Sequence, residues 1–275
     1  YGDHRDLHLS LRRQRQMCIR DRPNLLHGKI LRSPHAHARI ISIDASKALE
    51  HPGVKSVVTS DDLPVLSGRP VDVVEGSPMN PRFLSHNVLA SGKALYKGHA
   101  VAAVAADSVH TAEHALSLID VEYEVLTPVL DGKEAMEPGC PILHDRLFRS
   151  EGEFFRPGGL RDDDDDGPST NIASHFVFEL GEPEQGFDDA DVVVEREFRT
   201  KPVHQGYIEP HSATARWDRN GRVTIWGSSQ GHFAIRDFTA LVLGVPVSQI
   251  KVVPMEVGGG FGAVSYTHLT LPTKA

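Results

Sequence analysis

The chain has 275 residues, 40% hydrophobic and 24% charged, an ordinary globular composition with enough apolar residues for a core. Lys and Arg number 29 against 37 Asp and Glu, giving a formal net charge of −8. This acidic balance argues against a nucleic-acid or anionic-membrane partner, since both need a basic face on the protein. No run of residues is long and apolar enough to span a bilayer.

The two ends of the chain are related through their possible codons. Codons exist that make Ser10 to Asp21 the reverse complement of Val264 to Ala275 at every position. The implied DNA resembles a sequencing-library adapter, so we interpret residues 1–22 and 263–275 as non-native, adapter-like tails and set them aside. We expect natural protein from residue 23 to residue 262, cut at both ends.

The remaining chain is more acidic and has a single cysteine. Removing the seven Lys and Arg and the three Asp and Glu of the tails leaves 22 basic and 34 acidic residues, a net charge of −12. Cys18 lies in the first tail, which leaves Cys140 and predicts neither a disulfide framework nor a cysteine metal site. We expect a cytoplasmic protein; a periplasmic location stays open because the natural N-terminus is expected to lie outside the chain.

Alternating apolar residues predict strands over 28–32 and 38–43. Asp44 or Ser46 can cap a short helix, which His51-Pro52-Gly53 ends, and another strand is predicted over 54–60. The Pro-, Gly- and Ser-containing stretch from there to Lys93 shows little periodicity.

A strand–helix–strand unit is predicted next. The apolar run 99–107 suits a buried strand, Ser108 is a good helix N-cap, and 120–126 alternates as a second strand. The helix between them carries apolar residues near one face: Val109, Ala112, Leu116 and Ile119.

Residues 131–172 are predicted to be a connecting loop. They include several Pro-Gly turns and the five adjacent aspartates Asp162 to Asp166, whose mutual repulsion favours a solvated segment. A calcium site is the alternative, but bare acidic runs are usually only solvated.

The last part of the chain is predicted to be mostly strand, over 190–200, 214–229 and 250–257, with a hairpin turn at Asp218 to Gly221. A helix is predicted from His232 to Gly244. Its candidate packing residues are Phe233, Phe238, Leu241 and Leu243.

Two histidine-containing motifs invite a metal interpretation. His35 and His37 would face the same side of a strand, and His204, Glu209 and His211 have the ligand types of a mononuclear iron site. No carboxylate or third histidine lies close to the first motif in the sequence, and the spacing of the second fits no familiar helical metal motif. Packing and hydrogen bonding are therefore the favoured interpretations of both.

Two further motifs carry groups suited to ligand binding. Gln230 follows a predicted strand, where its amide can both donate and accept hydrogen bonds. The glycine-rich stretch from Gly258 to Gly262 also follows a strand, and glycines let backbone N–H groups approach an anion or oxo ligand. Neither motif is specific by itself.

The order of these stretches is specific. "RSPHAHARI", "GHAVAAVAAD", "HQGYIEPH", "SSQ" and "VGGGFG" follow one another at spacings that resemble the large, molybdopterin-binding subunit of the molybdenum hydroxylase family. This family includes xanthine dehydrogenase, aldehyde oxidase and carbon monoxide dehydrogenase. The resemblance covers nearly all of residues 25–262.

The resemblance implies an α+β fold, with an α/β hammerhead domain over 23–130 and the start of a molybdopterin-binding domain over 173–262. It implies a molybdenum–molybdopterin cofactor that hydroxylates an aldehyde, purine or N-heterocycle with oxygen from water, and 2Fe-2S and FAD centres on partner domains or subunits. An oligomer of the complete enzyme is also implied.

The site residues that the resemblance implies are Gln230, matching a glutamine that hydrogen-bonds an oxygen ligand of molybdenum, and Gly260, Phe261 and Gly262, matching a loop beside the metal. The glutamate that serves as base in the family is expected beyond the end of the chain, so no catalytic residue is assigned. Two alternatives stay open: a non-catalytic hammerhead-type scaffold, and a mononuclear iron enzyme using His204, Glu209 and His211.

Overall fold

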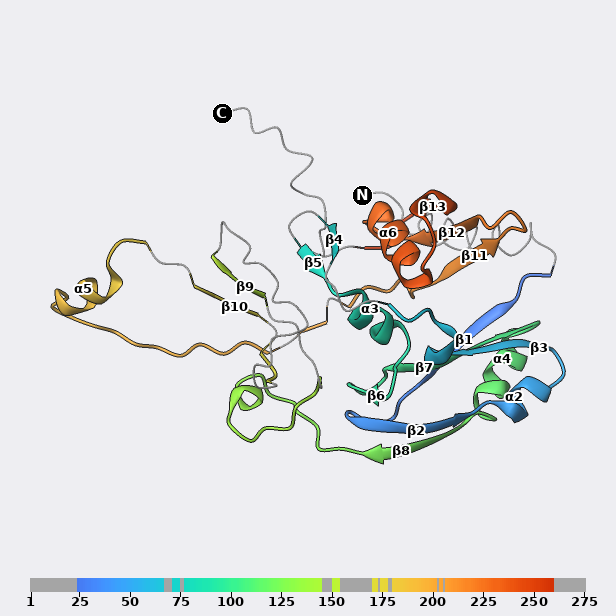
Figure 1. Ribbon diagram of the computed structural model, residues 1–275, viewed down its shortest axis with the longest axis horizontal. Helices are drawn as coiled ribbons and strands as arrows, with labels where there is room; N and C mark the ends of the chain where they lie inside the picture. Colours follow the sequence, from blue (N-terminus) through green and yellow to red (C-terminus); the bar gives the residue numbers. More distant parts are fainter. Residues whose placement is uncertain are drawn as a thin grey trace, which may run out of the picture.

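The computed structural model describes residues 24–66, 71–74, 77–144, 150–153, 170–172, 174–177, 180–201, 203–204 and 206–259. The two predicted tails, the aspartate run, and Gly260, Phe261 and Gly262 lie outside the described residues. The described elements form three sheets of three strands and two sheets of two strands, with a connecting region that extends to the left in Figure 1.

The first sheet has the order β1-β7-β3, with both pairings antiparallel. Its strands are β1 (His27–Arg32), β7 (Ala100–Ala106) and β3 (Val54–Thr59), as the apolar patterns predicted. The central strand β7 is built wholly of alanine and valine, and five of its seven residues are buried. These small side chains let the helices approach the sheet closely.

The second sheet has the order β6-β2-β8 and is also antiparallel. It consists of β6 (Lys93–Ala94), β2 (Ala38–Asp44) and β8 (Asp120–Val125). The predicted strand–helix–strand unit is therefore confirmed in its elements, but its two strands belong to different sheets. Residue periodicity reports only that each strand has a buried face, not which strand lies beside it.

Two short helices close the core of this half. Both α2 (Ser46–Glu50) and α4 (Val109–Leu116) lie beside the first sheet (Figure 1). Ser108 caps α4 by accepting the Thr111 N–H at 3.0 Å, as predicted. The core consists of Ala48, Ala102, Val104, Ala115 and Ile119. Leu116 packs at its edge, whereas Val109, expected on the buried face, is 39% exposed.

A helix also forms where the sequence showed little periodicity. Strands β4 (Val71–Val74) and β5 (Ser77–Met79) pair, and α3 (Pro81–Val88) follows them. Asn80 accepts the Arg82 N–H at 3.0 Å, and Pro81 occupies the first turn. The Asn-Pro pair is thus a helix start that periodicity alone did not reveal.

His99 is the most completely buried polar side chain of this region, at 1% exposure. Its Nδ1 accepts the Leu95 N–H at 3.2 Å, so the proton lies on Nε2, which donates to the His86 carbonyl at 2.9 Å. The ring stacks on Tyr96 with centroids 4.4 Å apart. This imidazole joins the turn before β7 to the end of α3 as a neutral ring.

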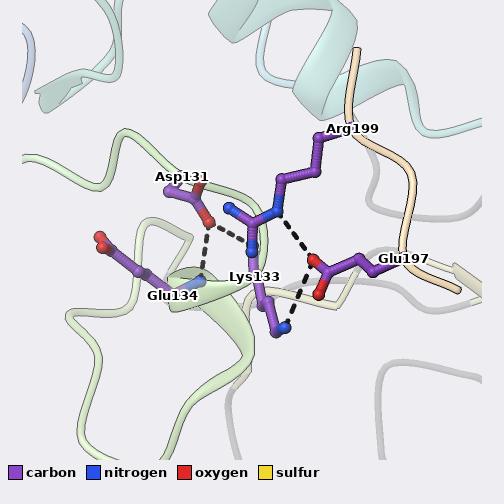
Figure 2. Close-up of polar contacts among 5 residues, drawn as sticks. All are labelled: Asp131, Lys133, Glu134, Glu197 and Arg199. Atoms are coloured by element: carbon purple, nitrogen blue, oxygen red, sulfur yellow. Dashed lines mark hydrogen bonds and ion pairs between the residues drawn. The ribbon is translucent and has the colours of Figure 1, made fainter. Parts of the chain in front are cut away.

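The connecting region after β8 contains the short turn η2 (Glu134–Met136) and a small parallel pair, β9 (Ser150–Glu153) with β10 (Ser174–Val177). Figure 2 shows the polar cluster that ties it to a later segment. Lys133 Nζ lies 3.6 Å from Glu197 Oε1, and Arg199 Nε donates to the same oxygen at 2.7 Å. All three side chains are more than half exposed, so these ion pairs contribute little to stability.

The strand predicted over 190–200 is absent, which corrects the sequence-based expectation. After the short helix α5 (Pro183–Asp188), the chain runs extended and exposed, and no described strand pairs with it (Figure 1). A β-strand is defined by its partner, so an alternating pattern cannot produce one where no second strand lies alongside.

The third sheet has the order β11-β12-β13. An antiparallel hairpin joins β11 (Ala213–Trp217) to β12 (Val223–Ser228), and β13 (Ile250–Met255) pairs with β12 in parallel. The helix α6 (His232–Leu243) makes the connection between the parallel strands, ends at Gly244 with φ 64°, and is followed by η3 (Val247–Gln249).

The packing face of α6 differs from the predicted one. Ala240 and Val242 are its buried residues, and Ala240 forms a core cluster with Val223 and Ile250. Phe233, expected to pack, is 75% exposed. The helix α6 also contacts α3 and β4, which links this sheet to the first half of the chain. Among the described helices, none has the length and apolar character to cross a membrane.

Replacing His99 with phenylalanine tests the buried imidazole. His99→Phe keeps an aromatic ring over Tyr96 but leaves the Leu95 N–H and the His86 carbonyl without their partner. Each buried group left unpaired costs about 1–3 kcal/mol, so we expect a clear loss in chemical denaturation. His110→Phe, at an exposed position of α4, is the matched control and should change stability by less than about 0.5 kcal/mol.

The same residue predicts a pH dependence. Burial lowers the pKa of His99 below its usual range, so between the folded and unfolded pKa values the unfolded chain binds more protons. The stabilising contribution is complete above the unfolded pKa of about 6.5 and is lost as the pH falls through that window. Subtracting the denaturation curves of His99→Phe from those of the wild type between pH 8 and pH 5 isolates this contribution from that of other histidines. A flat difference would contradict the prediction.

Candidate functional site

The candidate site lies where β12 and β13 end side by side. Their parallel register pairs Gly227 with Pro254 and Ser228 with Met255, so both strands end at the same edge of the sheet. In sheets with parallel strands and crossover helices, ligands bind outside the carboxyl ends of the strands. Two segments singled out in the sequence, the Gln230 turn and the glycine-rich stretch, begin at this edge.

Gln230 lies in the tight turn between β12 and α6. Ser229 Oγ accepts the Gly231 N–H at 3.0 Å, and this bond turns the chain from the strand into the helix. The Oε1 atom of Gln230 and the Nε2 atom of His232 are buried, and neither has a hydrogen-bond partner among the described residues. Buried polar atoms are nearly always paired, so these two mark a place where a further polar group belongs.

The glycine-rich stretch begins at Gly258, three residues after β13. Gly259 has φ 135°, a backbone conformation that favours glycine. An ideal Cβ at Gly258 would lie 2.6 Å from Glu209 Oε2 and 2.7 Å from Glu209 Cβ. The backbone at Gly258 therefore approaches another segment more closely than any side chain allows.

Glu209 connects the two strand ends. Its Oε1 accepts the Ser228 hydroxyl at 2.7 Å, and its Oε2 accepts the Gly258 N–H. The sequence places Glu209 in the motif with His204 and His211 and does not connect it with either strand. No local signal reveals this link, because the partners lie 19 and 49 residues away along the chain.

The proposed iron ligands do not form a metal site, which corrects that alternative. Both carboxylate oxygens of Glu209 accept hydrogen bonds from Ser228 and Gly258. His204 Nδ1 accepts a hydrogen bond from the Gly206 N–H at 2.9 Å, and His211 Nε2 forms a hydrogen bond with the Tyr207 hydroxyl. Among the described residues, no group of three or more His, Cys, Asp or Glu could hold a metal ion.

The first histidine motif also serves packing. His37 Nδ1 donates to the Thr127 carbonyl at 2.8 Å, and the His35 ring packs edge-on against Tyr123 with centroids 5.1 Å apart. This hydrogen bond connects the start of β2 with the segment that follows β8. These contacts agree with the packing interpretation of the motif.

Two family models match the chain. Residues 19–127 match the a/b hammerhead domain of aldehyde oxidase and xanthine dehydrogenase, and residues 164–272 match the molybdopterin cofactor-binding domain. The second match argues against a protein that has only a hammerhead scaffold. It also includes the whole of the β12–α6–β13 unit and Glu209.

Relatives with assigned names are similar over most of the chain. The "Probable hypoxanthine oxidase XdhD" of Escherichia coli (strain K12) is 35% identical over 86% of this chain, and the "Carbon monoxide dehydrogenase large chain" of Afipia carboxidovorans is 34% identical over 87%. The chain spans only 26% and 28% of the length of these relatives.

Solved structures agree with the fold. A reconstituted CO dehydrogenase from Oligotropha carboxidovorans superposes with a TM-score of 0.66 at 31% identity, covering 92% of this chain and 31% of that one. Quinoline 2-oxidoreductase from Pseudomonas putida 86 gives a TM-score of 0.64 at 27% identity, covering 91% of this chain and 30% of that one.

The predicted α+β fold, with a hammerhead domain followed by the start of a cofactor-binding domain, is thus confirmed. The motif order, the two consecutive domain matches and the structural likeness agree: the chain belongs to the molybdenum hydroxylase family of xanthine dehydrogenase, aldehyde oxidase and carbon monoxide dehydrogenase, as part of the molybdopterin-binding subunit.

Proposed function

We propose that the complete protein is the molybdenum-cofactor-binding subunit of an oxidoreductase that hydroxylates an aldehyde, a purine or an N-heterocycle. The observation that carries this proposal is Gln230, whose buried amide oxygen has no partner among the described residues, at the shared edge of β12 and β13. The cofactor-binding domain match covers this edge.

The residues present fit a molybdenum–molybdopterin cofactor. Gln230 offers an amide at a buried position, and Gly259, in the segment that follows β13, adopts a backbone conformation that favours glycine. An electron-rich oxygen ligand needs such oriented, uncharged donors. When bound, the cofactor supplies the two-electron oxidation of the substrate, with oxygen taken from water.

The chain's own residues have limited roles in this proposal. A flip of the Gln230 side-chain amide would present its NH₂ group in place of the unpaired Oε1, and this group would then donate a hydrogen bond to an oxygen of the cofactor and orient it. Gly260, Phe261 and Gly262, which lie outside the described residues, follow Gly259 in the sequence and are assigned to the cofactor by the family resemblance. The residue that acts as base, a glutamate by family resemblance, belongs to a later part of the complete protein.

The complete enzyme has partners in this proposal. Relatives are named a "large chain", a "large molybdopterin subunit" and a "complex subunit gamma", which supports a cofactor subunit working with other chains. We assign 2Fe-2S and FAD centres to such partner subunits or domains, and an oligomeric, cytoplasmic enzyme to the whole. The named substrates of the relatives differ among themselves, so the choice among substrate classes stays open.

Substitution of Gln230 in the complete enzyme tests the role of its amide. Removing one oriented donor of this kind costs about 100–1,000-fold in turnover, so Gln230→Ala should lower kcat by that factor while the protein folds and keeps its molybdenum. Gln230→Glu should also be slow, because a carboxylate would face an electron-rich oxygen. Metal analysis together with steady-state rates on one accepted substrate measures both effects.

Gln185→Ala supplies the matched control for this experiment. Gln185 is exposed on α5, away from the edge of β12 and β13, so its removal should leave turnover and metal content at wild-type values. If Gln230→Ala keeps full metal and wild-type turnover, Gln230 is a structural turn residue and the site is misplaced.

The 275-residue chain by itself should not retain the cofactor. It spans about a quarter of its relatives' length and supplies one glutamine and one loop to a site that needs later segments. Purified chain, incubated with the molybdenum cofactor and desalted, should hold far less than one molybdenum per chain by elemental analysis. Stoichiometric molybdenum would show that the described residues suffice for binding.

A further inference from the structure

Glu209 is the point at which three separate segments of the chain meet. It accepts a hydrogen bond from Ser228, at the end of β12, and another from Gly258, in the segment that follows β13. Its own segment precedes β11 and belongs to neither strand. One half-buried carboxylate thus holds the two strand ends together at the edge where the cofactor is proposed to bind.

The two donors occupy equivalent places in their segments. Ser228 stands two residues before Gln230, and Gly258 stands two residues before Gly260. A carboxylate has two oxygens a fixed distance apart, so bonding one donor to each fixes the spacing of the two segments. Hydrogen bonds to a charged acceptor are stronger than neutral ones, which suits a residue that holds loops in place.

Glu209 makes Gly258 selective for glycine. The three atoms nearest to a Cβ built there all belong to Glu209, and Gly258 is not among the glycines with positive φ. Alanine is therefore compatible with the backbone at this position, but its Cβ would clash with the glutamate side chain.

We infer that Glu209 is a positioning residue that sets the distance between the Gln230 turn and the backbone at Gly258, and thereby aligns the Gln230 amide for the reaction. The catalytic part of this inference rests on the proposed function. The physical part, that Glu209 holds the two strand ends, stands on the hydrogen bonds and the close approach at Gly258.

Amide hydrogen exchange on the 275-residue chain tests the physical part without any cofactor. In Glu209→Ala the Gly258 N–H loses its acceptor, and its exchange should accelerate about 10–100-fold. In Glu209→Gln the amide oxygen can accept the Gly258 N–H while the NH₂ group bonds Ser228, so protection should largely remain. Glu256→Ala removes an exposed carboxylate two residues from Gly258 and should leave its exchange unchanged.

A double substitution tests whether Glu209 is what refuses a side chain at Gly258. Gly258→Ala alone should lower the midpoint of thermal unfolding, whereas the same change in a Glu209→Gly background should lower it much less, because the clashing atoms are gone. Additive effects would overturn the close packing of these two residues. This comparison also remains informative if Glu209→Ala folds poorly.

The complete enzyme then tests the positioning role. Glu209→Ala should reduce kcat about 10–100-fold with metal content unchanged and KM little altered, since small misplacements of reacting groups carry penalties of this size. Glu209→Gln should restore most of the rate. Loss of molybdenum with normal turnover per bound metal would show a merely structural role and overturn the positioning role. If the complete wild-type enzyme contains no molybdenum, the proposed function is wrong. The hydrogen-exchange experiment would still test whether Glu209 holds the two strand ends together.

Discussion

The parallel pairing of β12 with β13 is the constraint on which the candidate site depends. A parallel pair cannot be joined by a tight turn, so the chain must travel back along the sheet, and α6 provides that return path. The small core of Val223, Ala240 and Ile250 fixes the helix against the strands. As a consequence, Gln230 and Gly258 both follow strands that end at one edge of the sheet, although they are 28 positions apart in the sequence.

Two polar side chains then hold separate segments of the chain at fixed positions. Glu209 joins the two strand ends, just as His99 joins the turn before β7 to the end of α3 in the hammerhead half. Each is a buried or half-buried group whose two polar atoms each bind a different segment of the chain. Such bridges constrain position more than they add stability, because the net free energy of a hydrogen bond is small while leaving a buried group unpaired is costly.

Local patterns predicted most elements of this protein. Alternation identified β1, β2 and β8, and an apolar run identified β7. Ser108 and Gly244 bounded α4 and α6 as their capping chemistry requires. Two of the element predictions failed, one because strand pairing depends on distant residues and one because a helix start was not recognised in the sequence. The alternating residues 190–200 have no described strand to pair with, and the start of α3 lay in the Asn80-Pro81 pair rather than in any periodicity.

The sequence by itself determined the chemistry available at the site: a glutamine after one strand, a glycine-rich stretch after another, and the motif order that indicates a molybdenum hydroxylase. Only the tertiary structure decided how they meet. It placed β7 and β8 in different sheets, brought the ends of β12 and β13 to one edge, and showed that Glu209 bridges Ser228 and Gly258. The physical reason is that periodicity records which face of an element is buried, whereas pairing and hydrogen bonding depend on residues far away in the sequence.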